Sequence, residues 1–142
     1  MEDKGLNDML LEVKNKMEEF CRISQEVQNF CTEHGVSEEK YQNISLILDE
    51  LITNVVSYAY PDGNQHTFTI NLEECDEKIC MCITDDGMPF NPLSLAEPDT
   101  ESSIEDRKIG GLGIFLVKQL SETVAYSRVD DKNQLYVKVS IL

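Results

Sequence analysis

Three short segments of this chain carry the residue types that a nucleotide-binding site requires. In chain order they are the pair Glu50 and Asn54, the pair Asp85 and Gly87, and the run Gly110, Gly111, Leu112 and Gly113. The first could supply a base and a metal ligand, the second could recognise a purine amine, and the third could hold phosphates. Each segment alone also occurs in ordinary structure, but the three in this order predict one nucleotide pocket.

Glu50 and Asn54 are one turn apart on a predicted helix, so their side chains are neighbours at the border of its apolar face. A half-buried carboxylate there could orient or deprotonate a water or hydroxyl group. The Asn54 carboxamide oxygen could be one ligand of an octahedral Mg²⁺ that also binds phosphate oxygens. The alternative is that both residues belong to an ordinary helix surface.

Asp85 ends a predicted strand, and Gly87 follows it after one residue. A carboxylate at a strand end can accept a hydrogen bond from the exocyclic amine of adenine, and a glycine lets a flat base approach the backbone. The alternative is a plain turn, since Asp-Gly segments followed by Pro are common in turns.

The glycine run from Gly110 to Gly113 precedes a predicted helix. Its backbone N–H groups and the positive helix N-terminus could hold phosphates, because glycine has no Cβ to block their approach. The run matches neither the P-loop nor the dinucleotide fingerprint. Arg107 and Lys108 stand just before it and could fold over a terminal phosphate, or could equally lie on a solvated loop surface.

A short strand and two helices are predicted in the first half of the chain. A strand over 9–13 is followed by a helix over 17–33, which Gly35 ends by taking the left-handed conformation. Ser37 is the predicted N-cap of the next helix. Apolar residues recur in that helix at the helical spacing up to about Tyr60, after which a turn containing Pro and Gly must end it.

Alternating apolar residues predict two antiparallel hairpins in the second half of the chain. Between the hairpins lie one short helix and a long loop, of the length that often covers a functional site. In chain order these elements are strands over 68–72 and 79–83 around a turn at 76–77, a loop over 90–109, a helix over 113–121, and strands over 124–126 and 135–141 around a turn at 130–133. The order β-α-α-β-β-loop-α-β-β predicts an α+β fold, a two-layer sandwich whose mixed, mostly antiparallel sheet is covered on one face by helices.

Composition and charge limit the classes of protein to which the chain can belong. Its 142 residues fit a single domain over 1–142. A net charge of −15 opposes binding to nucleic acid or to anionic membranes, because both need Lys and Arg against phosphates. No stretch has the apolar length of a signal peptide or a membrane span. The five cysteines lack metal-site spacing, and free thiols in a reducing cytoplasm are their expected state.

The three motifs, in their order and spacing, resemble the GHKL or Bergerat ATP-binding superfamily over nearly the whole chain. The likeness is closest to the standalone anti-sigma factor serine/threonine kinases of the RsbW and SpoIIAB type, on the segments 48–54 and 110–114. This resemblance implies that Asn54 coordinates Mg²⁺, that Glu50 is the general base and that Asp85 binds the adenine amine. The remaining site residues that it implies are Gly87, Arg107 against the γ-phosphate, Lys108, Gly110, Gly111, Leu112 and Gly113, with residues of about 88–110 as the ATP lid.

The resemblance further implies an ATP- and Mg²⁺-dependent kinase of the cytoplasm. Such a kinase phosphorylates a Ser or Thr of a small STAS-type anti-sigma antagonist and holds a sigma factor. A homodimer through the first strand and helix is also implied. A second hypothesis is a binding module in which ATP changes partner affinity without phosphoryl transfer. A third is a globular protein that has no nucleotide site.

Overall fold

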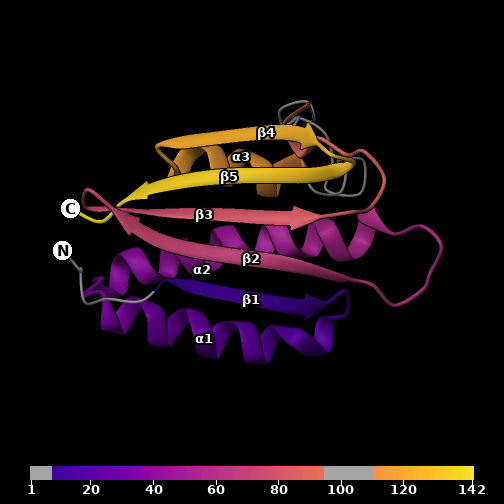
Figure 1. Ribbon diagram of the computed structural model, residues 1–142. Helices are drawn as coiled ribbons and strands as arrows, with labels where there is room; N and C mark the ends of the chain where they lie inside the picture. Colours follow the sequence, from indigo (N-terminus) through magenta and orange to yellow (C-terminus); the bar gives the residue numbers. More distant parts are fainter. Residues whose placement is uncertain (1–7, 95–110) are drawn as a thin grey trace.

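Residues 8–94 and 111–142, which are those the structure describes apart from the side chains of 111 and 112, form three α-helices and five strands. Figure 1 shows their arrangement in this computed structural model. The elements are β1 (Met9–Lys14), α1 (Phe20–Glu33), α2 (Glu38–Asn54), β2 (Thr67–Cys75), β3 (Lys78–Asp85), α3 (Gly111–Leu120), β4 (Thr123–Val129) and β5 (Lys132–Ser140). Short 3-10 turns lie before α1 (Met17–Glu19) and after β3 (Pro92–Ser94).

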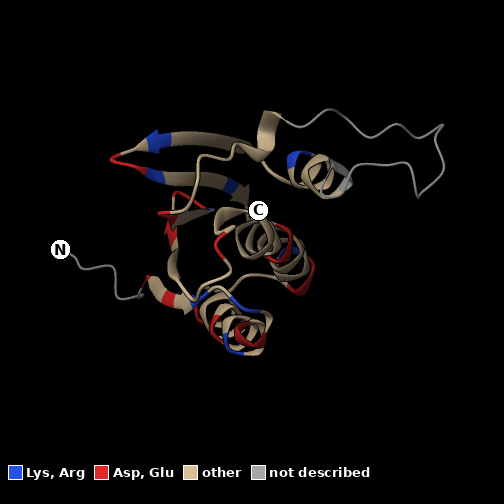
Figure 2. Ribbon diagram, turned by 90° about the vertical axis from the view of Figure 1, so that its right-hand side faces the viewer, with Lys and Arg blue, Asp and Glu red and all other residues tan. Residues whose placement is uncertain are grey.

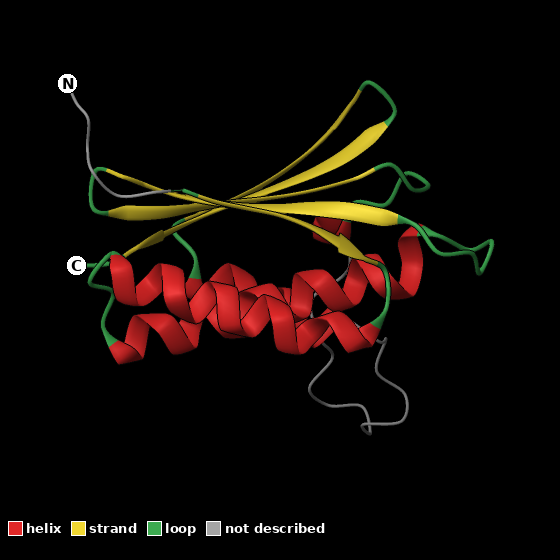
Figure 3. Cartoon of the chain, turned by 60° about the horizontal axis from the view of Figure 1, so that its bottom comes forward, coloured by secondary structure: helices red, strands yellow, loops and turns green. Residues whose placement is uncertain are grey.

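The strands form one sheet in the order β1-β2-β3-β5-β4, and the helices cover one of its faces (Figure 3). This confirms the predicted α+β sandwich. The expectation of a mixed sheet is wrong, since every neighbouring pair among the described strands is antiparallel. The reason is the position of β5. The connection through α3 makes β4 run parallel to β3, as a crossover helix does. Because β5 lies between these two strands and is antiparallel to both, no parallel pair forms.

The core lies between the sheet and the helices. Along β3 and β5 every second residue points to the helices, as the alternation predicted, and α2 contributes its apolar stripe. The fully buried side chains from these elements include Ile44, Ile47, Leu48, Leu51, Ile79, Met81, Ile83, Val137 and Val139. Helix α2 is therefore packed along its length, which fixes the position of the side chains at its C-terminal end.

Local signals set both ends of α2. The Ser37 hydroxyl accepts a hydrogen bond from the backbone N–H of Lys40 at 3.2 Å, as an N-cap does, and Gly35 before it has a φ of 69°. At its other end α2 continues as one π-helical turn, Val55–Ala59, and stops at Tyr60. The predicted start and end of this helix are confirmed. Single π-turns of this kind occur often at functional sites.

Both hairpins turn on two residues that are not glycine. Asp76 and Glu77 have φ values of 54° and 63°, and Asp130 and Asp131 have 54° and 61°. Two positive φ values in a two-residue loop are the condition for a type I′ turn. The predicted turn at 76–77 is confirmed, whereas the second turn is shorter than predicted and leaves Asn133 inside β5. Helix α3 also begins two residues earlier than predicted.

Acidic residues, drawn red in Figure 2, outnumber Lys and Arg along α1 and α2, in keeping with the net charge of −15. Among the described residues, none of the helices combines the length and apolarity needed to cross a membrane.

Candidate functional site

A pocket lies where the C-terminal end of α2 meets the end of β3. Two residues that the sequence singled out separately, Asn54 and Asp85, both line it. Its other walls come from the π-turn, from β4 and β5 and from the segment after β3. The full lining is Leu51, Asn54, Val55, Ala59, Ile83, Asp85, Phe90, Pro92, Tyr126, Asn133 and Leu135. The pocket is thus mostly apolar, with a few polar groups that converge, which is the usual character of a small-molecule site.

Asp85 is a buried carboxylate, with 6% of its surface exposed. Its Oδ1 atom accepts two hydrogen bonds of 2.9 Å, from the backbone N–H of Gly87 and from the side-chain amide of Asn133. The bond from Gly87 closes the kind of turn that was the alternative interpretation. An ionised carboxylate can accept about four hydrogen bonds, so this one keeps capacity for a ligand, above all at Oδ2.

Gly87 is packed against the end of α2. A Cβ added to Gly87 would lie 2.2 Å from the carbonyl oxygen of Ala59, and the next residue, Met88, donates its backbone N–H to that same oxygen at 2.8 Å. The carbonyl oxygen of Gly87 accepts a hydrogen bond from Nη1 of Arg128 at 2.8 Å. A glycine is therefore required here by the helix end, whereas the sequence pattern suggested a bound base as the close neighbour.

Asn54 is more buried than predicted. It was expected at a half-buried border, but only 4% of its surface is exposed, because the π-turn and the pocket residues close around it. Its Nδ2 atom has no hydrogen-bond partner in the structure. A buried N–H group without a hydrogen-bond partner destabilises the folded protein by about 1–3 kcal/mol. A ligand atom in the pocket that accepts a hydrogen bond from Nδ2 would remove this cost.

Glu50 lies one turn before Asn54 but lines a different depression, between α2 and α3. A Cβ added to Gly113 would lie 1.9 Å from the Glu50 carboxyl carbon, so this glycine makes room for the carboxylate. Burial raises the pKa of Glu50 above its ordinary value. A raised pKa brings a carboxylate closer to the range in which it can accept and return a proton near neutral pH.

Asn133 was predicted in a turn but is the buried centre of a hydrogen-bond network. Its Nδ2 donates to Asp85 Oδ1 at 2.9 Å and to the carbonyl oxygen of Met88 at 2.8 Å. Its Oδ1 accepts from the backbone N–H of Phe90 at 3.3 Å and from the Tyr126 hydroxyl. The signal that could have found it is the alternation of β5, because Asn133 is in phase with the buried residues that follow it.

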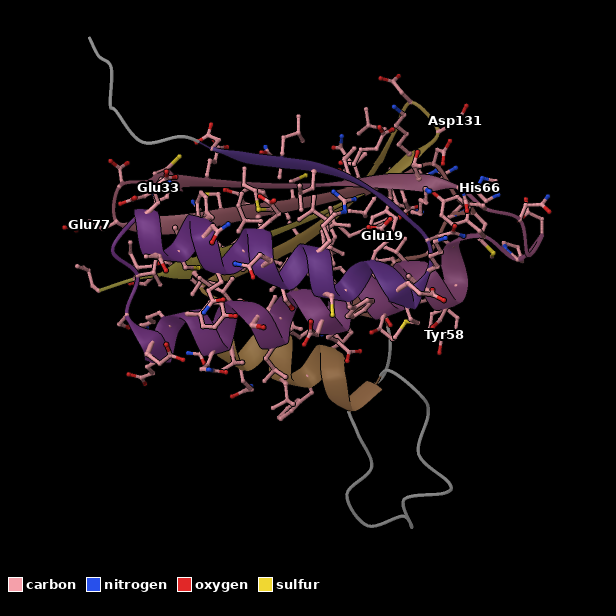
Figure 4. The ribbon with its side chains drawn as sticks, turned by 90° about the horizontal axis from the view of Figure 1, so that it is seen from below. Glu19, Glu33, Tyr58, His66, Glu77 and Asp131 are labelled. Atoms are coloured by element: carbon pink, nitrogen blue, oxygen red, sulfur yellow. The ribbon has the colours of Figure 1, made fainter. Side chains whose placement is uncertain are left out.

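Two pairs of aromatic rings lie at the end of the molecule that contains the pocket. The Tyr58 ring packs on Phe90 with 5.2 Å between centroids, and the Tyr60 ring stacks on His66 at 4.2 Å. Figure 4 labels Tyr58 and His66, which lie at this end of the molecule. The Tyr60 hydroxyl donates to Asp86 Oδ1 at 2.9 Å. Burial of Tyr60 and, after it, this hydrogen bond raise the pKa of its phenol, and the bond links the end of the π-turn to the residue after Asp85.

The structure brings together some of the predicted site residues. Asn54 and Asp85 share the pocket with Gly87 beside them, while Glu50 and Gly113 meet in the adjoining depression. Gly111 and Leu112 are in the first turn of α3. Arg107, Lys108 and Gly110 lie outside the described residues, as does the segment 95–110 of the predicted lid. No group of three His, Cys, Asp or Glu side chains suited to a metal occurs in the described parts of the chain.

Comparisons with known proteins agree on one family. The model of the histidine kinase-like ATPase domain matches residues 13–139. The chain is 27% identical over 92 residues to the serine/threonine-protein kinase BtrW of Bordetella bronchiseptica, covering 65% of each chain. It is 28% identical over 121 residues to the serine-protein kinase RsbW of Halalkalibacterium halodurans, covering 82% of this chain and 72% of that protein. The matched region thus leaves 35% of BtrW and 28% of RsbW uncovered.

The fold has a counterpart among solved structures. The crystal structure of the RsbU and RsbW domains of a Mycobacterium tuberculosis protein superposes on 95% of this chain, with a TM-score of 0.70 and 9% identity. The match covers 32% of that longer chain. At this identity the likeness concerns the fold alone.

Proposed function

The chain belongs to the histidine kinase-like ATPase domain family, and from this premise we propose that it is an anti-sigma factor kinase. In this proposal it binds Mg²⁺-ATP as one domain over 1–142, whose residues 88–110 cover the nucleotide. It transfers the terminal phosphoryl group to a Ser or Thr of a small STAS-type antagonist protein in the cytoplasm. Its relatives BtrW and RsbW are named as serine/threonine-protein and serine-protein kinases, which supports the kinase part of this proposal.

One observation carries the nucleotide part of the proposal. Asp85 and Asn54 come from distant parts of the chain, yet both are nine-tenths buried in the wall of one apolar pocket. Buried polar groups are normally paired within the protein. Here the Asp85 carboxylate keeps acceptor capacity and the Nδ2 atom of Asn54 lacks a hydrogen-bond partner. We assign Asp85 to the adenine amine, and Asn54 to the phosphate end of the same ligand.

The residues present fit a Mg²⁺ ion beside the nucleotide. The Asn54 amide can turn to present either its oxygen or its nitrogen, and the oxygen is a ligand that Mg²⁺ accepts. Since Mg²⁺ keeps several waters and binds phosphate oxygens, one amide from the protein is an ordinary share of its ligands. When bound, the ion would neutralise negative charge on the phosphates.

Glu50 is the proposed general base. It would accept the proton of the Ser or Thr hydroxyl as that oxygen forms its bond to the γ-phosphorus. The bond between the γ-phosphorus and the bridging oxygen breaks at the same centre, and ADP leaves. The first backbone N–H groups of α3, from Gly111 onward, are proposed to bind phosphate oxygens, because the first N–H groups of a helix have no partner within it. Arg107 and Lys108 are proposed to contribute charge at the terminal phosphate.

The proposed partners follow from the family resemblance and from charge. An acidic chain of net charge −15 is suited to a protein partner with a basic surface, and sigma factors and their antagonists are the partners of the resembled kinases. A homodimer through β1 and α1 is part of the same proposal. These two elements form one edge of the sandwich (Figure 1).

The test of the proposed function is transfer of label from γ-labelled ATP to a purified STAS-type antagonist, followed with Mg²⁺ present. Wild type is expected to transfer label, and Glu50→Gln to lose about 100-fold or more of the rate, the usual contribution of a general base. The matched control is Asp49→Asn, which neutralises the neighbouring carboxylate on α2 and should keep its activity. Transfer by Glu50→Gln at the wild-type rate would overturn the role of Glu50.

The same assay separates the kinase from a nucleotide-responsive binding module. ATP-dependent association with the antagonist, without any transfer of label, would replace the kinase proposal by the binding module. Absence of ATP binding by calorimetry would overturn both.

A further inference from the structure

Asn133 is a polar side chain in an apolar row. It precedes Leu135, Val137 and Val139 on the inner face of β5, and 5% of its surface is exposed. Asn is a poor strand former, and an amide in a core is destabilising unless its groups are hydrogen-bonded. All four hydrogen-bonding positions of this amide are used, two as donor and two as acceptor. These four hydrogen bonds therefore compensate for the burial of the amide in the core.

One partner of the Asn133 amide is the Asp85 carboxylate. Asn133 and Asp85 are directly paired across β5 and β3, so both side chains point to the same face. With Oδ1 of Asp85 engaged by Asn133 Nδ2 and by Gly87 N, rotation of the carboxylate about its terminal bond is restrained from two sides. A ligand in the pocket would then meet Oδ2 as the oxygen with free acceptor sites.

The Asn133 amide also binds the backbone of the segment after β3, which forms another wall of the pocket. The same amide accepts from Phe90 N and donates to the carbonyl oxygen of Met88. Phe90 lines the pocket together with Asp85. One side chain therefore sets both the orientation of the carboxylate and the position of the aromatic ring opposite an incoming base.

We infer that Asn133 is a positioning residue for base recognition: it aims Asp85 at the exocyclic amine of adenine and thereby selects purines that carry a 6-amino group. This inference rests on the proposed function, because it presupposes that the pocket takes ATP. It adds a residue at which neither the motifs nor the family resemblance placed a role.

The test compares two ligands in two proteins by calorimetry. One ligand is ATP and the other is purine riboside triphosphate, which has hydrogen in place of the 6-amino group. Wild type is expected to bind ATP about 10- to 100-fold more tightly, as a charge-assisted hydrogen bond allows. In Asn133→Ala this preference should fall about 10-fold, toward equal binding. At saturating ATP the rate of phosphoryl transfer should stay near that of wild type, so the change appears in KM.

A merely structural role predicts a different result, since a loosened pocket would weaken both ligands equally and leave their ratio unchanged. That outcome would overturn the inference. The matched control is Gln134→Ala, because Gln134 is the next residue of β5, lies on the other face of the sheet and is not part of the pocket wall. Its preference for ATP should remain within about 2-fold of wild type.

A second variant keeps the test decisive if Asn133→Ala does not fold. Asn133→Leu has nearly the same shape and suits the row that contains Leu135, but it cannot donate to Asp85. It should lose the preference for the 6-amino group in the same way. Failure of wild type to bind ATP would overturn the proposed function itself. An unchanged ratio in a variant that does bind ATP would overturn the role of Asn133 alone.

Discussion

Gly87→Ala tests how tightly the Asp85 turn is built against the end of α2. The new Cβ would lie 2.2 Å from the Ala59 carbonyl oxygen, whereas ordinary contact begins at 3.4 Å, so the two segments must separate by about 1.2 Å. That movement breaks the 2.8 Å bond from Met88 N to the same oxygen. A lost hydrogen bond and the strain of overpacking together cost about 2–4 kcal/mol.

Such a loss is a large part of the 5–15 kcal/mol that stabilises a typical domain. For a chain of this length it should lower the melting temperature by about 6 to 15 °C in calorimetry. The turn that moves also carries the Gly87 N–H bond to Asp85, so the affinity for ATP should fall with it.

The control is Gly35→Ala, because Gly35 has a φ of 69° and no atom within 4 Å of an added Cβ. This substitution should lower the free energy of unfolding by only about 1–2 kcal/mol, the cost of a left-handed backbone at a residue with a Cβ. The variant should bind ATP as wild type does. If the Gly87→Ala protein melts within about 2 °C of wild type and keeps its affinity for ATP, the packing argument is refuted.

Three other predictions concern stability and accessibility. Asp131→Gly removes a left-handed non-glycine residue at φ 61° and should stabilise the protein by about 0.5–1 kcal/mol in denaturant unfolding. The raised pKa of Glu50 means that its stabilising contribution is complete below the unfolded pKa of about 4.3 and is lost as pH rises through the folded value. Glu50→Gln should therefore raise the melting temperature at pH 7 and raise it less at pH 4. Burial raises the pKa of Cys31 to about 11, so mass spectrometry after alkylation of the native protein should find exposed Cys21 modified and Cys31 intact.

Much of the fold follows from local signals in the sequence. Ser37 as N-cap, Gly35 in the left-handed region and the alternation of the strands each depend on neighbours within a few residues. For the same reason Asp85 was correctly expected at a strand end, and Glu50 and Asn54 on one helix. These residues could be predicted because their places are fixed by periodicity.

The remaining site residues depend on contacts between distant segments. Asn133 follows two Asp residues and a Lys, a composition typical of a turn, and only its pairing with Asp85 across the sheet explains its burial. The requirement for Gly87 likewise comes from Ala59, which the chain brings close through a π-turn that has no local sequence signal. Tertiary packing decided both positions.

The most direct test of the ATP site is the melting temperature of wild type and of Asp85→Asn with and without Mg²⁺-ATP. A ligand present at about 100 times its dissociation constant adds roughly 2.7 kcal/mol to the free energy of unfolding. Asp86→Asn is the matched control, because it makes the same charge change at the exposed neighbouring residue. The account predicts a clear upward shift for wild type and Asp86→Asn, and none for Asp85→Asn. No shift in wild type at millimolar ATP, or an equal shift in Asp85→Asn, would contradict it.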